Sequence, residues 1–394
     1  MEDRDHPRAD PGRGHALASI EATAKRFYEG THRTRSPRET WEALRPLLPA
    51  AGITRVADVT TLDRIGVPVY QAVRPASLNL SVSQGKGASP DAARASAAME
   101  AFELWHAEDL SHLPQATLSF REARYANPIP LESLRWSPNL PPPAGLRLPW
   151  VSARSLSHER QGWLPRAMLE LDFRLGPEIA PAPFRRTSNG LASGNCREEA
   201  LLHALCELVE RHALSLAEED AGRRVPVIED SVEAPGCREL IGRIRTAGMK
   251  LAVRDITCEL GLPAFRVDLA APDLPRTWRG AGCHTCPAVA LSRALTEAAQ
   301  SRLTVIAGSR DDVRESPAGE PSFQFFEEFL EPQGGRAFPD VPDLSTASVA
   351  ADVDRVVERL AGCGLEAFWV DLTRPEIGIP VVFAFIPGLR EPIH

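Results

Sequence analysis

The chain has 394 residues, which is long enough for one large or two ordinary domains with a substantial core. Its formal net charge of −8 argues against a surface that binds nucleic acid or an anionic membrane. Charges and proline stand near the N-terminus where a signal peptide needs an apolar run, and no stretch is apolar for the length of a membrane span. Seven scattered cysteines are typical of a reduced compartment, so we expect a cytoplasmic protein.

The first part of the chain predicts a tail followed by short helices. Residues 1–18 are rich in charge, proline and glycine, and we expect a disordered tail ahead of one domain that spans 19–394. A basic turn covers residues 25–34. Ser36 and Pro37 then predict a helix with serine as its N-cap and proline in its first turn, and this helix ends at Gly52.

Three stretches of the chain repeat one pattern of residues. Each has a glycine that ends a helix, a strand, an Asp-x-Thr turn and a second strand that starts at a proline. The copies run over residues 52–69, 248–264 and 364–381, and residues 150–165 predict a degenerate fourth hairpin. The pattern predicts an α+β fold of repeated hairpin-helix units, with antiparallel strands on one side and helices on the other.

One long helix, within residues 188–211, carries an acidic stripe. Glu199, His203, Glu207 and Glu210 fall on one face at a period of 3.6 residues, while leucines occupy the opposite face. If this stripe faced inward without a counter-charge, its burial would cost several kcal/mol of folding free energy, unless the carboxyl groups were protonated or bound a cation. A solvated helix face is the alternative.

The same arrangement recurs on two further predicted helices. All three read polar-Ala-x-x-Glu-x-x-Glu/Gln, which places three polar side chains on one face. The three sets are Ser96, Glu100 and Glu103; His203, Glu207 and Glu210; and Arg293, Glu297 and Gln300. Converging carboxylates suit Mg²⁺, which typically shares its ligands with phosphate oxygens, so the pattern predicts a Mg-nucleotide site. A di-iron site needs two Glu-x-x-His pairs on helices, and the three predicted helices supply a single one, at residues 103–106.

Several basic residues stand near these helices. Lys86, in the glycine-rich segment 83–87, could approach a phosphate, although the spacing is not that of a Walker A loop and a tight turn explains it equally well. Arg211, Arg293, Arg302 and Arg310 could bind phosphate or form ion pairs with the same glutamates. The cysteines of the Cys-His-Thr-Cys run at 283–286 lack a second ligand pair, which makes structural zinc a poor explanation.

These segments resemble the YcaO superfamily of ATP-dependent enzymes that activate peptide backbone amides. The resemblance extends from about Lys25 to the C-terminus. It is carried by GKGASPDAARASAAMEAFE, SNGLASGNCREEALLHALCELVER and GCHTCPAVALSRALTEAAQSRLTVIAGSRDD. The earlier KRFYEGTHRT and ITRVADVTTLDRIGVPV are similar to the branch that is encoded beside TfuA-type partners and linked to thioamide formation.

The resemblance implies roles for residues of the three stripes. Metal ligands would be Glu100, Glu103, Glu199, Glu207, Glu210 and Glu297. Nucleotide contacts would come from Ser96, Asn195, Glu199 and Gln300, and we add Lys86 and Arg302 for their charge. Catalytic roles would fall to Glu207, Glu210, Arg211, Arg293 and Glu297. The implied cofactors are ATP and Mg²⁺.

In the implied reaction, a nucleophile adds to an amide carbonyl, the carbonyl oxygen attacks the γ-phosphate of ATP, and phosphate then leaves with that oxygen. External sulfide would give a thioamide with the help of a TfuA-like partner, whereas a neighbouring Cys, Ser or Thr side chain would give an azoline. A non-catalytic peptide-binding scaffold is the third alternative. Two departures matter: Leu104 stands where the family often has arginine, and the chain ends at His394 without the proline-rich C-terminus of some azoline-forming members. The expected substrate is a peptide or a protein. The sequence does not decide between a monomer and a homodimer.

Overall fold

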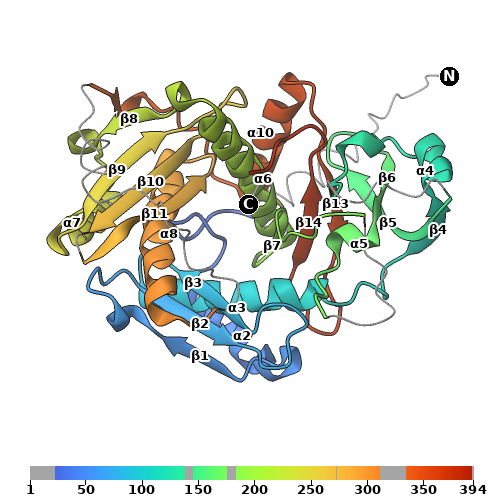
Figure 1. Cartoon of the computed structure of the whole chain (residues 1–394), viewed down its shortest axis with the longest axis horizontal. Helices are drawn as coiled ribbons and strands as arrows, with labels where there is room; N and C mark the ends of the chain where they lie inside the picture. The colour runs from blue at the N-terminus through green and yellow to red at the C-terminus, as the bar shows by residue number, and fades with distance from the viewer. Residues whose placement is uncertain (1–22, 138–144, 175–182, 272, 311–333, 393–394) are drawn as a thin grey trace, which may run out of the picture.

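The computed structural model describes residues 23–137, 145–174, 183–271, 273–310 and 334–392. These residues form three β-sheets of three, five and six strands, with long helices packed against them (Figure 1). The predicted tail at 1–18 and a short helix that the sequence suggests around residues 323–330 lie outside the described ranges. Within those ranges, no helix combines the length and apolar character that a membrane span requires.

The first unit contains the predicted helix, hairpin and carboxylate helix. Its elements are α2 (Pro37–Leu44), η1 (Arg45–Ala51), β1 (Arg55–Asp58), η2 (Thr60–Leu62), β2 (Val69–Val73), β3 (Val82–Lys86) and α3 (Pro90–Ala107). Ser36 caps α2 as predicted, in a capping box with Glu39. The chain leaves the helical region at Gly52 as predicted, but its last turns, which contain Pro49, are a 3₁₀-helix.

The second unit repeats this order. Its elements are α7 (Pro235–Thr246), β9 (Lys250–Asp255), β10 (Ala264–Ala271), β11 (Leu274–Cys283) and α8 (Pro287–Ala307). On the side of β9 away from β10, the sheet continues through β8 (Val225–Ile228) and β12 (Arg336–Ala337). The order β11-β10-β9 therefore matches β3-β2-β1 of the first unit.

The Asp-x-Thr turns have the same hydrogen bonds in all three copies. The aspartate carboxylate accepts the N–H of the threonine two residues later, at 2.9 Å for Asp58, 2.8 Å for Asp255 and 3.0 Å for Asp371. The threonine hydroxyl oxygen accepts the N–H that opens the next strand, from Val69, Ala264 and Val381 at 3.1, 3.1 and 3.2 Å. The predicted internal repeat is thus confirmed at the level of individual hydrogen bonds.

The third unit is assembled from two distant parts of the chain. Its helix α10 (Val349–Gly362) and its strands β13 (Phe368–Asp371) and β14 (Val381–Phe385) come late in the sequence. Strand β14 pairs with β7 (Leu191–Ser193), which leads into α6 (Arg197–Glu219). Three equivalent backbone bonds establish the correspondence: Gly87 to Pro68, His284 to Pro263 and Gly194 to Pro380, at 3.1 to 3.3 Å. The middle of the chain therefore completes a unit that its end begins.

A peripheral region joins the sheet of the third unit. It contains β4 (Gln115–Ser119), α4 (Phe120–Ala126), η3 (Leu131–Ser133), β5 (Arg147–Ser155), β6 (Gln161–Pro165) and α5 (Arg166–Leu169). Strands β5 and β6 form the hairpin predicted at residues 150–165, and β5 pairs with β13. This hairpin has no Asp-x-Thr turn, so it is not a fourth copy of the unit.

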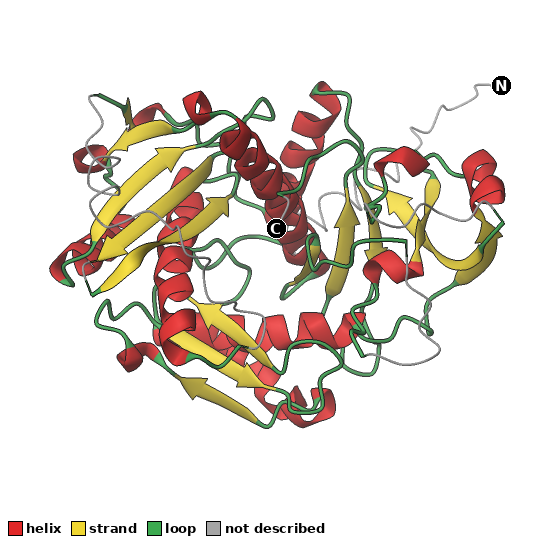
Figure 2. Cartoon of the chain, viewed as in Figure 1, coloured by secondary structure: helices red, strands yellow, loops and turns green. Residues whose placement is uncertain are grey.

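Close contact between strands and helices brings the three long helices together. A Cβ atom added at Gly85 of β3 would lie 2.0 Å from the backbone nitrogen of Ala97 in α3. One added at Gly282 of β11 would lie 2.1 Å from the backbone oxygen of Ala290 in α8. Glycine is therefore required at both positions. The packed helices α3, α6 and α8 lie on three sides of the molecular centre (Figure 2).

Candidate active site

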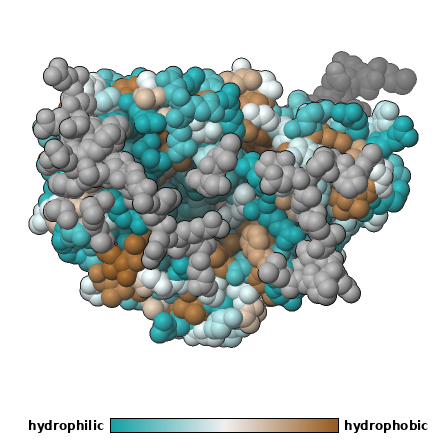
Figure 3. Space-filling model, in the orientation of Figure 1, coloured by the Kyte–Doolittle hydropathy of each residue, from teal (hydrophilic) through white to brown (hydrophobic). Residues whose placement is uncertain are grey.

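The three polar stripes line one cavity of about 680 Å³ where α3, α6 and α8 meet. Figure 3 shows a recess with hydrophilic residues in the middle of this face. The predicted site residues that line the cavity are Lys86, Ser96, Glu100, Glu103, Asn195, Glu199, Glu207, Glu210, Arg211, Arg293, Glu297 and Gln300. Since the stripes converge and Glu199 and Glu210 are 0% and 6% exposed, the alternative of a solvated helix face does not hold.

Burial raises the pKa of most of these carboxyl groups. The pKa of Glu103 rises to about 8, because its desolvation and the nearby charge of Glu100 outweigh its hydrogen bonds from Ser193. Burial also raises the pKa of Glu210 to about 7, and it raises the pKa values of Glu100 and Glu207. Carboxylates that are costly to ionise in isolation are suited to binding a hard cation, which replaces the proton.

Basic side chains compensate part of this charge. Burial opposes ionisation of Glu297, but the Lys86 ammonium at 2.8 Å and the Arg211 guanidinium outweigh it and lower the Glu297 pKa. Burial also opposes the charge of Arg211, but Glu210 and Glu207 raise its pKa above the ordinary arginine value. The cavity thus contains basic side chains beside carboxylates whose charge they neutralise only in part. This combination fits a Mg²⁺–polyphosphate ligand, whose phosphates would contact the basic side chains and whose metal would contact the carboxylates.

The last residue of each motif ties its helix to a strand of another unit. Glu103 of the first unit accepts the N–H and hydroxyl of Ser193 in the third, at 2.8 and 2.6 Å. Glu210 of the third unit accepts the N–H of Cys283 in the second at 3.1 Å. The Gln300 amide of the second unit donates to the Gln84 carbonyl of the first at 3.0 Å. These contacts form a closed ring through the three units, so the cavity exists only when all three are assembled.

An N-terminal segment that sequence analysis did not assign to the site closes one side of the cavity. Glu29, Gly30, Thr31, Arg33 and Arg35 contribute to the lining. Glu199 accepts the N–H and hydroxyl of Thr34 at 2.6 and 2.7 Å, and the N–H and side-chain amide of Asn195 at 3.0 and 2.9 Å. The basic character of residues 25–34 was the available signal, but nothing in the sequence indicated its partner on α6.

The same segment is anchored far from its own position in the sequence. Lys25 forms a buried ion pair of 2.6 Å with Asp352 at the start of α10, and its ammonium donates to the Thr346 carbonyl at 2.8 Å. Both side chains of the ion pair are fully buried. Removing either partner would leave an uncompensated buried charge, so this contact holds the segment firmly against the third unit.

Arg302 does not join the other predicted site residues. It lies on α8, is 2% exposed and pairs with Asp63 at 3.0 Å and Asp273 at 2.5 Å. Its guanidinium also stacks over Trp278 at 4.6 Å. The structure therefore assigns its charge to an internal network and not to the cavity lining. Arg310, by contrast, does line the cavity.

The Cys-His-Thr-Cys run lies at the junction of β11 and α8. The His284 ring accepts the Cys286 N–H at 3.0 Å, which satisfies one of the free amides at the start of α8. In the described ranges, the His, Cys, Asp or Glu side chains whose ligand atoms lie within 4.8 Å of one another in a group of three are His212, Cys258 and Glu259, and the group includes none of the residues of this run. The run therefore forms the turn at which α8 begins.

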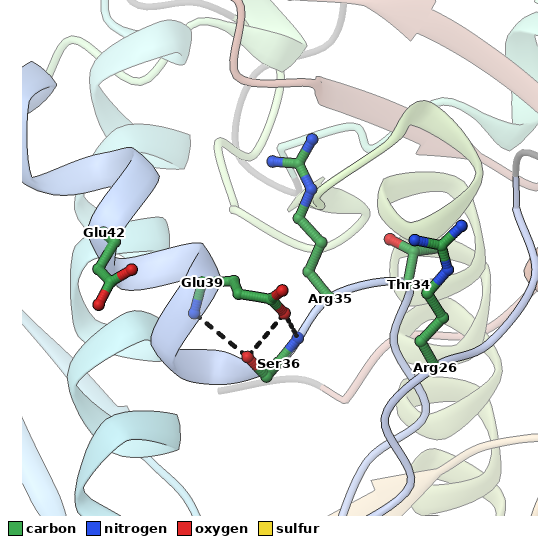
Figure 4. Close-up of a pocket in the computed structure, with 6 residues that line it drawn as sticks. All are labelled: Arg26, Thr34, Arg35, Ser36, Glu39 and Glu42. Atoms are coloured by element: carbon green, nitrogen blue, oxygen red, sulfur yellow. Dashed lines mark hydrogen bonds between the residues drawn. The ribbon is translucent and has the colours of Figure 1, made fainter.

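A second cavity of about 540 Å³ lies beside the first and shares Arg35 with it (Figure 4). Its lining residues are Arg26, Thr34, Arg35, Ser36, Glu39 and Glu42. Glu39 bonds to Ser36 at the start of α2, and Glu42 pairs with Arg38 at 3.1 Å. The N-terminal segment thus separates an open cavity on one side from the carboxylate cavity on the other.

Comparison with known proteins decides the family. A family model described as YcaO cyclodehydratase, binding ATP and Mg²⁺, matches residues 84–390. The chain belongs to the YcaO family. As a YcaO protein it is a member of a family of ATP-dependent enzymes that modify peptides, with ATP and Mg²⁺ as cofactors. The residues of the cavity fit both, through the carboxylates for the metal and the basic side chains for phosphate.

A relative and two solved structures add detail. An uncharacterized protein encoded in the tfuA 3′ region of Rhizobium leguminosarum bv. trifolii is 37% identical over 380 residues, covering 91% of this chain and 88% of the relative. A heterocyclase in complex with substrate and cofactor aligns with a TM-score of 0.77 at 25% identity, covering 95% of this chain and 55% of the heterocyclase. YcaO from Methanopyrus kandleri bound with AMPPCP and Mg²⁺ aligns with a TM-score of 0.72 at 25% identity, covering 93% and 94%. The predicted α+β fold is confirmed by these likenesses.

Proposed function

We propose that this YcaO protein uses ATP to phosphorylate the oxygen of a peptide backbone amide, which sulfide then replaces to give a thioamide, with a TfuA-like partner. The observation that carries the proposal is the convergence of three buried carboxylate stripes with Lys86, Arg211 and Arg293 in one cavity. The relative encoded beside tfuA, which covers most of both chains, supports the choice of thioamide and of partner.

The acidic and the basic residues of the cavity would have different roles. Glu100, Glu207 and Glu297 would hold Mg²⁺, while Lys86, Arg211 and Arg293 would lie against phosphate oxygens. Bound ATP supplies the phosphoryl group that turns an amide oxygen into a leaving group. Fixed charges in a buried cavity stabilise charge that develops on the transferring group more strongly than water does, so catalysis rests on positioning and electrostatics.

The nucleophile would come from outside the chain. Among the described residues, the lining of the cavity includes no cysteine. In the proposed step, the sulfur of HS⁻ bonds to the amide carbon, the C–O bond breaks, and phosphate leaves with the original oxygen and the proton of HS⁻. A partner protein that delivers sulfide fits this requirement.

Azoline formation is the second candidate, favoured by the cyclodehydratase description of the family model and by the likeness to a heterocyclase. There the substrate's own Cys, Ser or Thr side chain attacks the amide carbon, and the same phosphorylated oxygen leaves. Mass spectrometry of a peptide treated with ATP and a sulfide source separates the two reactions: oxygen-to-sulfur exchange supports the thioamide, whereas loss of water supports the azoline.

The direct test is calorimetric binding of ATP and Mg²⁺ to the protein and to Glu207→Gln. We expect the substitution to weaken binding at least about tenfold, since it removes one charge of the metal site. Glu218→Gln is the matched control, because Glu218 lies on the same helix in an exposed ion pair with Arg279 at 2.8 Å. Absence of nucleotide binding by the unaltered protein, together with retained peptide binding, would favour the scaffold alternative instead.

A further inference from the structure

One peptide group links the active-site carboxylate of Glu207 to a buried arginine outside the cavity. The N–H of Gly190 donates to the Glu207 carboxylate at 2.9 Å. The carbonyl of Asn189, which belongs to the same peptide group, accepts from Nη2 of Arg135 at 2.9 Å. A single planar unit therefore has its positive end on a carboxylate and its negative end on a guanidinium.

Arg135 is itself held in place from several sides. It is 4% exposed, and its Nε donates to the Glu391 carboxylate at 2.6 Å. Its guanidinium lies over the rings of Phe383 and Phe385 in β14, at 5.4 and 5.8 Å from their centroids. These contacts come from the end of the third unit, whereas Arg135 belongs to the peripheral region.

The backbone at Gly190 leaves little freedom for this peptide group. Gly190 has a φ of +85°, and a Cβ atom there would lie 2.3 Å from the carbonyl oxygen of Ala384. Its own carbonyl accepts the Ala384 N–H at 2.7 Å. Gly190 is thus held against β14 through its own carbonyl, and the peptide group before it is held by Arg135, while residues with a side chain cannot replace the glycine.

We propose that Arg135, held by Glu391, is a positioning residue that fixes the Gly190 N–H on Glu207 and thereby sets the Mg²⁺ affinity of the site. Its link to Mg²⁺ rests on the proposed function, whereas its link to Glu207 rests on the hydrogen bonds alone. Hydrogen bonds that share one peptide group strengthen each other, because each polarises the unit toward the other. Arg135 therefore acts on Glu207 through the peptide as well as through its charge.

The electrostatics of Glu207 agree with this arrangement. Burial raises the pKa of Glu207, while Arg211, the Gly190 N–H and Arg135 act in the opposite direction. Arg211 is in the cavity and available to a ligand, but Arg135 is outside the cavity lining. The Gly190–Arg135 pathway thus stabilises the charged carboxylate without occupying space that a metal or phosphate needs.

The first measurement is hydrogen exchange at the Gly190 amide in the protein without ligand. We expect Arg135→Met and Glu391→Gln to speed exchange at Gly190 by about tenfold, the effect of weakening one hydrogen bond to a charged group. Glu207→Gln should do the same. The matched controls are Arg74→Met and Glu108→Gln, because buried Arg74 likewise pairs with a carboxylate, Glu108, at 2.8 Å and donates to a backbone carbonyl, that of Ala51, at 2.9 Å. They should leave Gly190 unchanged.

The second measurement is the Mg²⁺ dependence of binding of a non-hydrolysable ATP analogue, by calorimetry. We expect Glu391→Gln to raise the Mg²⁺ concentration for half-saturation by about tenfold. In a Glu207→Gln background the same change should have no further effect, since its route to the metal is already lost. If Glu391→Gln acted only by loosening the fold, its effect on the Mg²⁺ concentration would add to the effect of Glu207→Gln. Faster hydrogen exchange would then also not be confined to the Gly190 amide.

The outcomes separate the two proposals. If the unaltered protein binds no nucleotide with Mg²⁺, the proposed function fails, and hydrogen exchange at Gly190 alone decides the role of Arg135. If exchange at Gly190 is equal in Arg135→Met and Arg74→Met, the positioning role is refuted even where nucleotide binding is intact.

Discussion

Glu103 and Glu210 keep their protons in the ligand-free protein at pH values where glutamate in an unfolded chain has lost them. Their folded pKa values are about 8 and about 7, raised by burial, against an ordinary 4.5. Between these limits the folded state binds more protons than the unfolded state, so the stability that these two groups contribute is fully present below pH 4.5 and is lost as the pH rises through their folded pKa values. A cation bound in the cavity weakens this dependence, because its positive charge favours the ionised form of the nearby carboxyl groups.

We therefore predict that the free energy of unfolding falls from about pH 4.5 to about pH 8 and then levels off. Urea denaturation at several pH values in this window, with and without Mg²⁺ and an ATP analogue, measures the effect. Glu103→Gln should flatten the slope, since glutamine does not titrate. An identical slope in that variant would show that Glu103 is already ionised in the free protein.

Arg302 lies outside the cavity, so its substitution is expected to change stability and not nucleotide binding. Because its guanidinium lies between Asp63 and Asp273, Arg302→Met leaves the buried Asp63 carboxylate without its ion-pair partner, whereas Asp273 keeps Arg64 at 3.3 Å. We expect a loss of about 3 kcal/mol or more of stability, with the ATP affinity of the folded protein unchanged within about twofold. Chemical denaturation measures the first and calorimetry below the unfolding transition measures the second. Loss of ATP affinity without loss of stability would restore Arg302 to the nucleotide site.

Periodicity in the sequence identified residues on helices better than residues on loops. Glu100, Glu207 and Glu297 repeat at fixed positions in three helices, so their convergence could be predicted from spacing. Thr34 and Arg33 lie in an irregular segment whose partner, Glu199, is distant in the sequence. No local pattern encodes such a contact, because it depends on where the chain passes after folding.

At the scale of elements, small residues allow a strand and a helix to pack closely, as Gly85 of β3 does against Ala97 of α3. Gly85→Ala would place a Cβ atom 2.0 Å from the backbone of α3 at Ala97, and neither backbone can yield without moving its whole element. We predict a loss of about 3 kcal/mol in the free energy of unfolding. A clear rise in nucleotide dissociation constant should accompany it, because α3 carries Glu100 and Glu103.

Gly242→Ala is the contrasting change within a helix. Gly242 lies in α7, and an added Cβ atom would meet nothing within 4 Å. We expect a gain of about 0.5–1 kcal/mol, because alanine favours the helix, and no change in nucleotide binding. Urea denaturation of both variants tests the pair. Equal effects at Gly85 and Gly242 would contradict the packing argument.

The hairpins of the three units could be predicted from the sequence, but the composition of the third unit could not. Each Asp-x-Thr turn is local, and its residues determine its hydrogen bonds wherever it occurs. The pairing of β14 with β7 joins strands that are far apart in the chain, and β7 has just three residues. Such a short strand has no periodic signal of its own, so its place became visible only in the assembled sheet.

At the scale of the molecule, a ligand in the cavity contacts all three units at once. We predict that an ATP analogue with Mg²⁺ raises the midpoint of thermal unfolding by about 3 °C at roughly 100 times its dissociation constant, as linkage requires for a chain of this size. Nucleotide with a chelator should give a much smaller shift, because the carboxylates then repel the phosphates. Equal shifts with and without Mg²⁺ would contradict a metal-dependent site.

The late completion of the third unit also has a consequence for how the protein is made. On the ribosome, β7 and α6 emerge roughly 190 residues before β14, which corresponds to about 10–40 s at ordinary rates of synthesis. During that interval the apolar face of α6 and an edge of β7 lack their partner strand, and the nascent chain is open to association with other chains. The carboxylate cavity forms only after β14 has been translated, so the proposed function predicts that an incomplete chain does not bind nucleotide.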